Sequence, residues 1–310
     1  MRVSVIIPCY NVSGFVARAV KSVRCQTHPD LELIAVDDGS TDGTMDELLR
    51  LSREAGTPLT IIRQKNLGAC AARNSGLVSA TGDFIQFLDA DDVLLPDKIT
   101  HQVDLARREG GADLIIGSHA TFDAQGSSLG RTTQHPHHRD VWLDLMSHRM
   151  GGTCQNLWSK QAVIGVGGWA EGLRSSQEYD LMFRLLKNDA RVVYDPEVLT
   201  EIHQRTSGSI SQTGIEHNWE RFVDLRIRII EHLRSTRPDP ELEPYLQVLF
   251  DSIRTYYLHA PDRAVAIYET HMPTGFIPVR STATGAGYLL LHRLLGFRRA
   301  NRLRSLFARG

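Results

Sequence analysis

Short runs of β-branched and other apolar residues alternate with helical patterns over about the first 120 residues of the chain. This alternation predicts five strands separated by amphipathic helices. The predicted strands are Val3–Ile7, Leu31–Val36, Leu59–Gln64, Asp83–Leu88 and Leu114–Ile116. Strands and helices that alternate in this way are typical of a parallel α/β sheet covered by helices.

Four helices are predicted between and after these strands. The first has an apolar face over Phe15–Val23, and the second begins after Thr41, which is a suitable N-cap. The third covers Gly68–Ala80, and we expect Pro96 to be the first residue of the fourth. Residues 119–139 are rich in Gly, Ser, Thr and His without periodicity, which predicts an exposed loop or flap.

The pattern changes twice in the remaining chain. Residues 140–210 predict a helix at Ser176–Asn188 and two strands, Arg191–Tyr194 and Val198–His203. After Gly214 the pattern is helical, with predicted helices at Trp219–Leu233, Leu242–Leu258 and Tyr288–Ala308. We therefore expect an α/β domain at residues 1–213 and a helical extension at residues 214–310.

The composition is that of an ordinary soluble protein. With 310 residues, 42% of them hydrophobic, the chain can bury one large core and an appendage. A formal net charge of -1 gives no overall electrostatic reason to bind nucleic acid. The four cysteines are widely spaced and the first apolar run is short, so we expect a cytoplasmic protein without a disulfide framework or membrane anchor.

Polar and aromatic side chains gather where the first, second and fourth predicted strands end. The segments are Pro8-Cys9-Tyr10-Asn11, Asp37-Asp38-Gly39-Ser40-Thr41-Asp42 and Asp89-Ala90-Asp91-Asp92. Each segment alone is also explained as a turn whose polar side chains satisfy backbone donors. Ligands of open α/β sheets bind at these strand ends, and carboxylates there can accept bonds from a base or ribose or hold a divalent cation. Their joint placement favours a nucleotide site.

Five motifs, taken in order, carry a resemblance to a known family. They are SVIIPCYN, VDDGSTDGT, NLGACAARNSGL, FLDADDVLLPDK and SSQEYDLMFRLL, and together they resemble the family 2 glycosyltransferases of GT-A fold over about residues 1–211. The resemblance implies transfer of a sugar from a nucleotide diphosphate donor, most commonly a UDP-sugar, to an acceptor hydroxyl with inversion. It also implies a GT-A sheet flanked by helices, followed here by the helical extension.

The resemblance assigns the donor side of the site residue by residue. The implied nucleotide-binding residues are Pro8, Tyr10, Asn11, Asp37, Asp38, Arg73 and Asp89, with one of the two adjacent aspartates on the base. Asp91 is the second acid of the family's DxD motif and is the implied ligand of Mg²⁺ or Mn²⁺. His203 is at the place of a family histidine near the diphosphate, although a lone strand histidine is more often structural.

The acceptor side is less typical of the family. Glu178 is in the position of the catalytic base, where the family commonly has aspartate, and Asp180 is a weaker alternative. The run Ser175–Glu178 also matches a capping box, in which the glutamate would only bond a backbone N–H. Trp169, in a glycine-rich segment, is expected either to offer a flat face to an acceptor sugar or to be a core aromatic.

Other functions fit less well. A dinucleotide-dependent oxidoreductase would have a glycine-rich turn where this chain has Pro8–Asn11, and a Walker-type motif is absent from the sequence. The alternative that stays open is a catalytically silent nucleotide-sugar-binding or scaffold protein, because the base position departs from the usual acid.

The C-terminal segment, residues 288–310, has six arginines and no acidic residue among its leucines and phenylalanines. It is predicted to be a basic amphipathic helix, which would lie on an anionic membrane surface or pack on the preceding helices or a second subunit. The first reading fits a lipid-linked acceptor and cell-surface polysaccharide or glycolipid synthesis, as the resemblance suggests, at the inner face of the membrane.

Overall fold

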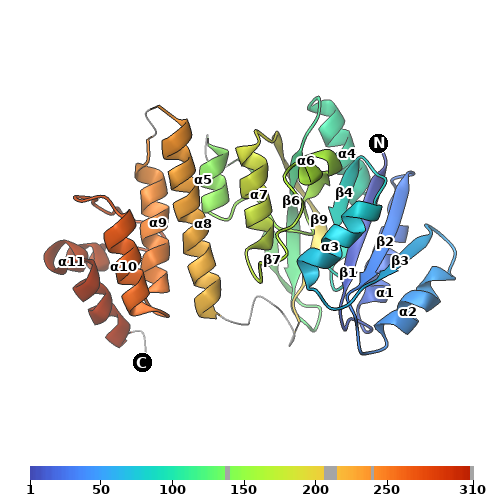
Figure 1. The fold of residues 1–310 in the computed structure, drawn as a ribbon, viewed down its shortest axis with the longest axis horizontal. Coiled ribbons are helices and arrows are strands. Elements are labelled where there is room, and N and C mark those ends of the chain that lie inside the picture. Colours follow the sequence, from blue (N-terminus) through green and yellow to red (C-terminus); the bar gives the residue numbers. More distant parts are fainter. Residues whose placement is uncertain (137–139, 206–214, 239–240, 308–310) are drawn as a thin grey trace. The chain divides into compact units, whose positions relative to one another are not determined.

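The computed structural model describes residues 1–136, 140–205, 215–238 and 241–307. The chain divides into two compact units, residues 1–209 and 210–310, and each is described by itself. The predicted domain boundary at residue 213 lies outside the described residues. The first unit contains the sheet, and the second is helical (Figure 1).

Within the described residues, nine strands form one sheet in the order β3-β2-β1-β4-β8-β6-β9-β5, with β7 paired to β6. The strands are β1 Val3–Cys9, β2 Leu31–Asp37, β3 Leu59–Arg63, β4 Phe84–Phe87, β5 Val93–Leu94, β6 Leu114–Phe122, β7 Ser128–Thr132, β8 Leu157–Ser159 and β9 Val192–His203. β1 to β4 are mutually parallel, whereas β8 runs antiparallel to both β4 and β6. The α/β sheet flanked by helices that the sequence predicts is confirmed, and its antiparallel strands make the sheet mixed rather than wholly parallel.

The helices of the first unit follow the strands. They are α1 Val16–Arg24, α2 Thr44–Ser52, α3 Ala69–Ser79, α4 Lys98–Arg108, α5 Val141–Met146, α6 Lys160–Gly165 and α7 Gln177–Lys187. α3 lies against β1 and β2 so closely that a Cβ on Gly76 would be 2.4 Å from Cγ2 of Ile6. A glycine is therefore required where this helix crosses the sheet.

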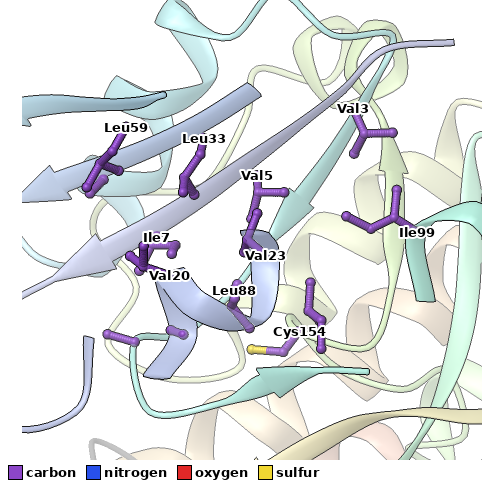
Figure 2. Packing of buried hydrophobic residues seen from close by; sticks show 14 of the residues in the cluster. Val3, Val5, Ile7, Val20, Val23, Leu33, Leu59, Leu88, Ile99 and Cys154 are labelled. Carbon is purple, nitrogen blue, oxygen red and sulfur yellow. The ribbon is translucent and has the colours of Figure 1, made fainter. Parts of the chain in front are cut away.

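The apolar residues of the parallel strands form the main core. Val5, Ile7 and Leu33 point toward the buried face of α1, which contributes Val20 and Val23 (Figure 2). Complete burial of such a side chain contributes about 1.5–3 kcal/mol. This packing fixes the register of β1, β2 and β3, so that Cys9 pairs with Asp37 and Asp37 with Arg63. The strands consequently end at a common edge.

Three local predictions were wrong. Pro96 lies in the turn before α4, where its carbonyl accepts the N–H of Thr27 at 2.9 Å, and the helix begins at Lys98. Much of the expected flap at residues 119–139 is a hairpin of β6 and β7, because Asp123 accepts the N–H groups of two residues in its turn. The two strands predicted between residues 191 and 203 are one strand, β9, whose pairing with β6 shifts register.

The second unit consists of α8 Ile215–Thr236, α9 Glu243–Tyr256, α10 Pro261–His271 and α11 Ala286–Phe307. Its core is aromatic, with Phe250 near Tyr268 and Tyr268 stacked on Phe297 at 4.1 Å between ring centroids. The predicted continuous helix at the C-terminus is interrupted by Gly296, which has φ 73°. In the part of the chain that the structure describes, we find no helix with the length and apolar character needed to span a bilayer.

Candidate active site

The loops after β1 and β2 hold each other in place. Asn11 adopts the left-handed conformation with φ 52°, and its side-chain oxygen accepts the N–H of Thr41 at 2.9 Å. In return, the N–H of Asn11 donates to the hydroxyl of Ser40 at 3.0 Å. Tyr10, just before, has an exposed side chain. The tyrosine is thus exposed next to two loops that hydrogen bonds hold together.

Asp42 strengthens the same junction. Its carboxylate accepts the N–H of Thr44 at 2.9 Å and the N–H of Ser13 at 3.2 Å. Burial alone would raise the pKa of Asp42, but hydrogen bonds from the hydroxyl and N–H of Thr44 and from Ser13 outweigh it and lower that pKa to about 2. The loop junction therefore keeps its charge at any physiological pH.

The two adjacent aspartates at the end of β2 have different partners, and both are buried. Asp38 accepts three hydrogen bonds, all from the segment between β3 and α3, including the N–H of Leu67 at 2.9 Å and the N–H of Gly68 at 2.8 Å. Asp37 accepts the N–H of Ser40, and its Oδ2 has no hydrogen-bond partner within the described residues. That one of these two aspartates binds the nucleotide base stays a prediction.

The turn after β4 crowds three carboxylates. Burial, with added repulsion from Asp89 and Asp91, raises the pKa of Asp92 well above its usual value. Ligand atoms of Asp89, Asp92 and Cys154 all lie within 4.8 Å of one another. The thiol of Cys154 also accepts the N–H of Asp89 at 3.2 Å, and the residue itself lies in the hydrophobic core cluster (Figure 2).

Such a turn fits a divalent cation, because a cation would relieve the repulsion among oxygens of the kind that Mg²⁺ and Mn²⁺ prefer. The predicted metal ligands, however, have protein partners here. Asp91 Oδ2 is 2.5 Å from Nε of Arg205. His203 Nε2 is 3.4 Å from Glu201 Oε2, and its ring stacks on Phe122. The structure thus brings Asp91 and His203 to one cavity without joining them.

That cavity has a volume of about 630 Å³ and opens beside the turn. Its lining comes from the β1–α1 loop, the β6–β7 turn, Asp91 and the end of β9; the residues are Asn11, Phe15, Arg18, Asp91, Asp123, Ala124, Gln125, Gly126, His203, Gln204 and Arg205. Two arginines therefore line a cavity adjacent to the predicted metal site.

Arg73, on α3, connects the turn after β4 to the segment predicted to be on the acceptor side. Its guanidinium donates to Asp89 Oδ1 at 2.8 Å and to the side-chain oxygen of Gln177 at 2.9 Å. It also lies 4.6 Å from the ring centroid of Trp169. Because the Arg73 side chain is only 6% exposed, it is held rigidly in this bridge. The arginine predicted to be on the nucleotide side thus also fixes the start of α7.

Glu178 is the second residue of α7. Burial raises its pKa, its own backbone N–H and Arg73 oppose this increase, and Asp89 adds to it. The helix has Ser176 as its N-cap, with no side-chain capping bond. Because a capping box needs the glutamate at the third helical position, the predicted Ser175–Glu178 box does not form. A half-buried carboxyl therefore lies at the helix start beside Arg73.

Two predicted acceptor-side residues have other surroundings. Asp180 is buried, and its Oδ2 pairs with Nε of Arg184 at 2.8 Å, so its charge is engaged within α7. Trp169 is 2% exposed and packs edge-on against Phe87. The expectation that Trp169 offers an accessible face to a sugar is wrong for this conformation, because core aromatics and Arg73 cover the ring.

Three residues of the site were not singled out from the sequence. Arg205 follows His203 by two positions, and Gln177 directly precedes Glu178, so proximity to those residues was the available signal. Cys154 is 65 positions away from Asp89, and only the antiparallel pairing of β8 with β4 brings its segment to the turn. No local pattern indicates such a contact.

The profile of glycosyl transferase family 2 matches residues 4–178. An uncharacterized glycosyltransferase of Nostoc sp. is 40% identical over 42% of this chain and 42% of its own length. One from Rickettsia conorii is 30% identical over 71% of this chain and 38% of its own length. The chain thus spans about two fifths of these relatives.

Two solved structures share the fold. TarS of S. aureus, residues 1–349 in complex with UDP-GlcNAc, superposes with TM-score 0.63 at 19% identity, and the match covers 88% of this chain and 76% of TarS 1–349. The mannosyltransferase PcManGT from Pyrobaculum calidifontis, in complex with GDP-Man and Mn²⁺, gives TM-score 0.55 at 19% identity, covering 100% of this chain and 88% of its own. At 19% identity these similarities show a shared fold and do not by themselves indicate a shared substrate.

Proposed function

The chain belongs to glycosyl transferase family 2, and we propose that it transfers a sugar from a nucleotide diphosphate donor to an acceptor hydroxyl. One observation carries the proposal. Arg73 bonds both Asp89, in the acidic turn after β4, and Gln177, the neighbour of Glu178. A carboxyl with a raised pKa is thereby held beside a turn suited to a divalent cation and a diphosphate.

For the donor we propose a UDP-sugar. TarS was solved with UDP-GlcNAc and PcManGT with GDP-Man, so proteins of this fold bind nucleotide sugars of more than one base. In this chain Tyr10 would stack on the base, and Pro8 and Asn11 would border the nucleoside. Asp37 or Asp38 would accept a base N–H, and Asp89 would contact the ribose.

For the metal we propose Mg²⁺ or Mn²⁺, held by Asp91 with His203. When bound, the cation would stabilise negative charge on the departing diphosphate. Asp89 and Asp92 add negative charge to the same turn, so they would increase its affinity for a cation. Carboxylate oxygens with one imidazole are ligands that accommodate Mn²⁺.

Glu178 would act as general base. Its carboxylate accepts the proton of the acceptor hydroxyl while that oxygen forms a bond to the anomeric carbon. The bond from this carbon to the diphosphate oxygen breaks, and the electron pair leaves with the nucleoside diphosphate. A single displacement of this kind inverts the anomeric centre. Burial supports the role, since it gives Glu178 a higher proton affinity than a solvated glutamate has.

The acceptor is proposed to be lipid-linked, at the inner face of the membrane. α11 exposes Leu290, Leu294 and Leu306 together with Arg298 and Arg302, and residues 286–307 include no acid. An anionic lipid surface complements both features. The wild type should co-sediment with vesicles that contain phosphatidylserine. The triple variant Arg298→Gln/Arg299→Gln/Arg302→Gln should stay in the supernatant. Equal sedimentation of both proteins, or equal binding to neutral vesicles, contradicts this part.

The donor proposal is tested by a thermal-shift screen against UDP-, GDP- and dTDP-sugars, each with Mn²⁺ and with a chelator. A ligand that binds only the folded state raises the midpoint of unfolding. We expect a shift with one nucleotide class that needs Mn²⁺. The absence of a shift with every donor would favour a scaffold role.

A further inference from the structure

Arg205 makes the most unusual contact in the candidate site. Its Nε is 2.5 Å from Oδ2 of Asp91, the carboxylate that the family resemblance gives to the metal. The two side chains are 19% and 18% exposed, so this is not a solvated surface pair. The guanidinium therefore occupies the place where a divalent cation would bind Asp91.

The surroundings of Arg205 belong to the cavity beside the turn. The guanidinium carbon lies 4.7 Å from the ring centroid of Phe15, which is a stacking contact. Arg18 donates to the backbone carbonyl of Asp91 at 2.6 Å and lines the same cavity. Asp91 is the single carboxylate with which Arg205 makes an ion pair among the described residues. If a cation took this carboxylate, the Arg205 charge would need another anion.

We propose that Arg205 is exchanged between Asp91 and the donor diphosphate: a divalent cation takes Asp91, and the released guanidinium binds the diphosphate in the same cavity. This inference rests on the proposed function for its donor. Arginine suits the exchange, because its planar fork binds carboxylate and phosphate oxygens alike. Arg205 would then stabilise the charge that develops on the leaving group.

The exchange has a thermodynamic consequence. Without donor, the metal must displace Arg205 from Asp91, so its affinity is reduced. With donor present, the displaced guanidinium gains the diphosphate, and each ligand improves the binding of the other. A purely structural ion pair would instead support Asp91, and its loss would weaken metal binding.

The test is a titration of the whole protein with Mn²⁺, in which the electron paramagnetic resonance signal of free Mn²⁺ reports binding. Without nucleotide, Arg205→Gln should bind Mn²⁺ about three- to tenfold more tightly than the wild type, because the competing charge is gone. At saturating Mn²⁺, calorimetry should show UDP bound at least about tenfold more weakly by the variant.

Two further variants make the result specific. Arg205→Lys keeps the charge and should leave Mn²⁺ affinity near that of the wild type, while UDP binding is weakened. Arg107→Gln removes an exposed arginine that pairs with Asp104 on α4, and should change neither affinity. Circular dichroism and thermal midpoints confirm that each variant is folded.

Unchanged or weaker Mn²⁺ binding by Arg205→Gln, with normal UDP binding by the wild type, overturns the exchange and leaves the proposed function standing. If Arg205→Gln binds Mn²⁺ more tightly but binds UDP as well as the wild type does, the diphosphate half of the proposal, in which Arg205 binds the diphosphate, is overturned. If the wild type binds no UDP even with Mn²⁺, the proposed function fails, and the diphosphate half fails with it.

Discussion

The loops after β1 and β2 and the turn after β4 lie at the same edge of the sheet, but they are stabilised differently. In the loops, polar groups bond one another, as Asn11 does with Ser40 and Thr41. In the turn, Asp89 and Asp91 are each paired with an arginine from a distant segment, Arg73 or Arg205. The first region is held mainly by hydrogen bonds from backbone and neutral side-chain groups, whereas the charges of the second are balanced by arginines from distant segments.

The difference indicates which part of the site is preformed. A nucleoside would meet loops whose hydrogen bonds need no rearrangement, which lowers the cost of binding. A metal and a diphosphate would meet a turn whose negative charge is already balanced by arginines. Binding there is an exchange of ion pairs, so it should respond to charge substitutions in both directions.

We expect the largest effect on the rate of transfer from a substitution of the proposed base. Glu178→Gln removes the proposed base and should lower the rate of transfer by about 10²- to 10⁴-fold, while Mn²⁺-dependent UDP binding is unchanged. Transfer is measured as the release of nucleoside diphosphate. Glu171→Gln, which alters an exposed carboxylate bonded to Asn74, is the matched control. Undiminished transfer by Glu178→Gln would remove this residue from the mechanism.

The pH dependence of the wild type tests the same residue. Because burial raises the pKa of Glu178 above its usual 4.5, the carboxylate is protonated at a higher pH than that of a solvated glutamate. Only the deprotonated form accepts a proton, so kcat/KM should fall as the pH decreases through this raised pKa. An acid limb of the kcat/KM profile at or below pH 4.5 would be evidence against Glu178 as the base.

The same type of substitution, aspartate to asparagine, should affect stability differently in the two regions. Asp38 accepts three hydrogen bonds with its two oxygens, and Asp38→Asn replaces one of these oxygens by an NH2 group that cannot accept. The substitution should lower the free energy of unfolding by about 1–3 kcal/mol. Asp92→Asn relieves repulsion from Asp89 and Asp91 and should be neutral or stabilising without metal. Urea unfolding in a chelator measures both. Equal destabilisation would contradict the contrast between a region held by hydrogen bonds and one in which carboxylates repel one another.

Lys98, the first residue of α4, is buried and should make the stability depend on pH. Its ammonium is buried against Gln86, and burial lowers its pKa from 10.5 to about 7. Between these values the unfolded state binds more protons, so the free energy of unfolding should increase from pH 7 to pH 10.5, with no contribution to the slope below pH 7. Lys98→Met should reduce that slope in urea titrations. An unaltered slope would show that Lys98 does not titrate in this range.

The smallest effect concerns the loop junction alone. Asn11→Gly keeps the left-handed backbone but removes the acceptor for the N–H of Thr41, which should lower the free energy of unfolding by about 0.5–1.5 kcal/mol. UDP binding should weaken only slightly. A loss of UDP binding as large as that expected for Arg205→Gln would mean that these loops are not preformed.

The sequence predicted the strand ends well, because parallel strands bring consecutive polar segments to one edge. It also indicated Arg73 and Glu178 from the resemblance. It could not predict contacts that depend on distant pairing, such as Arg205 with Asp91 or Cys154 with Asp89. The choice between face and core for Trp169 was likewise decided only by tertiary packing, which covers the ring.

The proposed function requires this sheet edge to bind a sugar nucleotide with a metal and to transfer its sugar. The most direct measurement is the release of nucleoside diphosphate from UDP-, GDP- and dTDP-sugars by the wild type, with Mn²⁺ and with a chelator, in the presence of membrane lipid extract as acceptor source. We expect release from one donor class, which the chelator abolishes and Glu178→Gln strongly reduces. Release that is equal with chelator, or absent for every donor although Mn²⁺ and UDP bind, would contradict it.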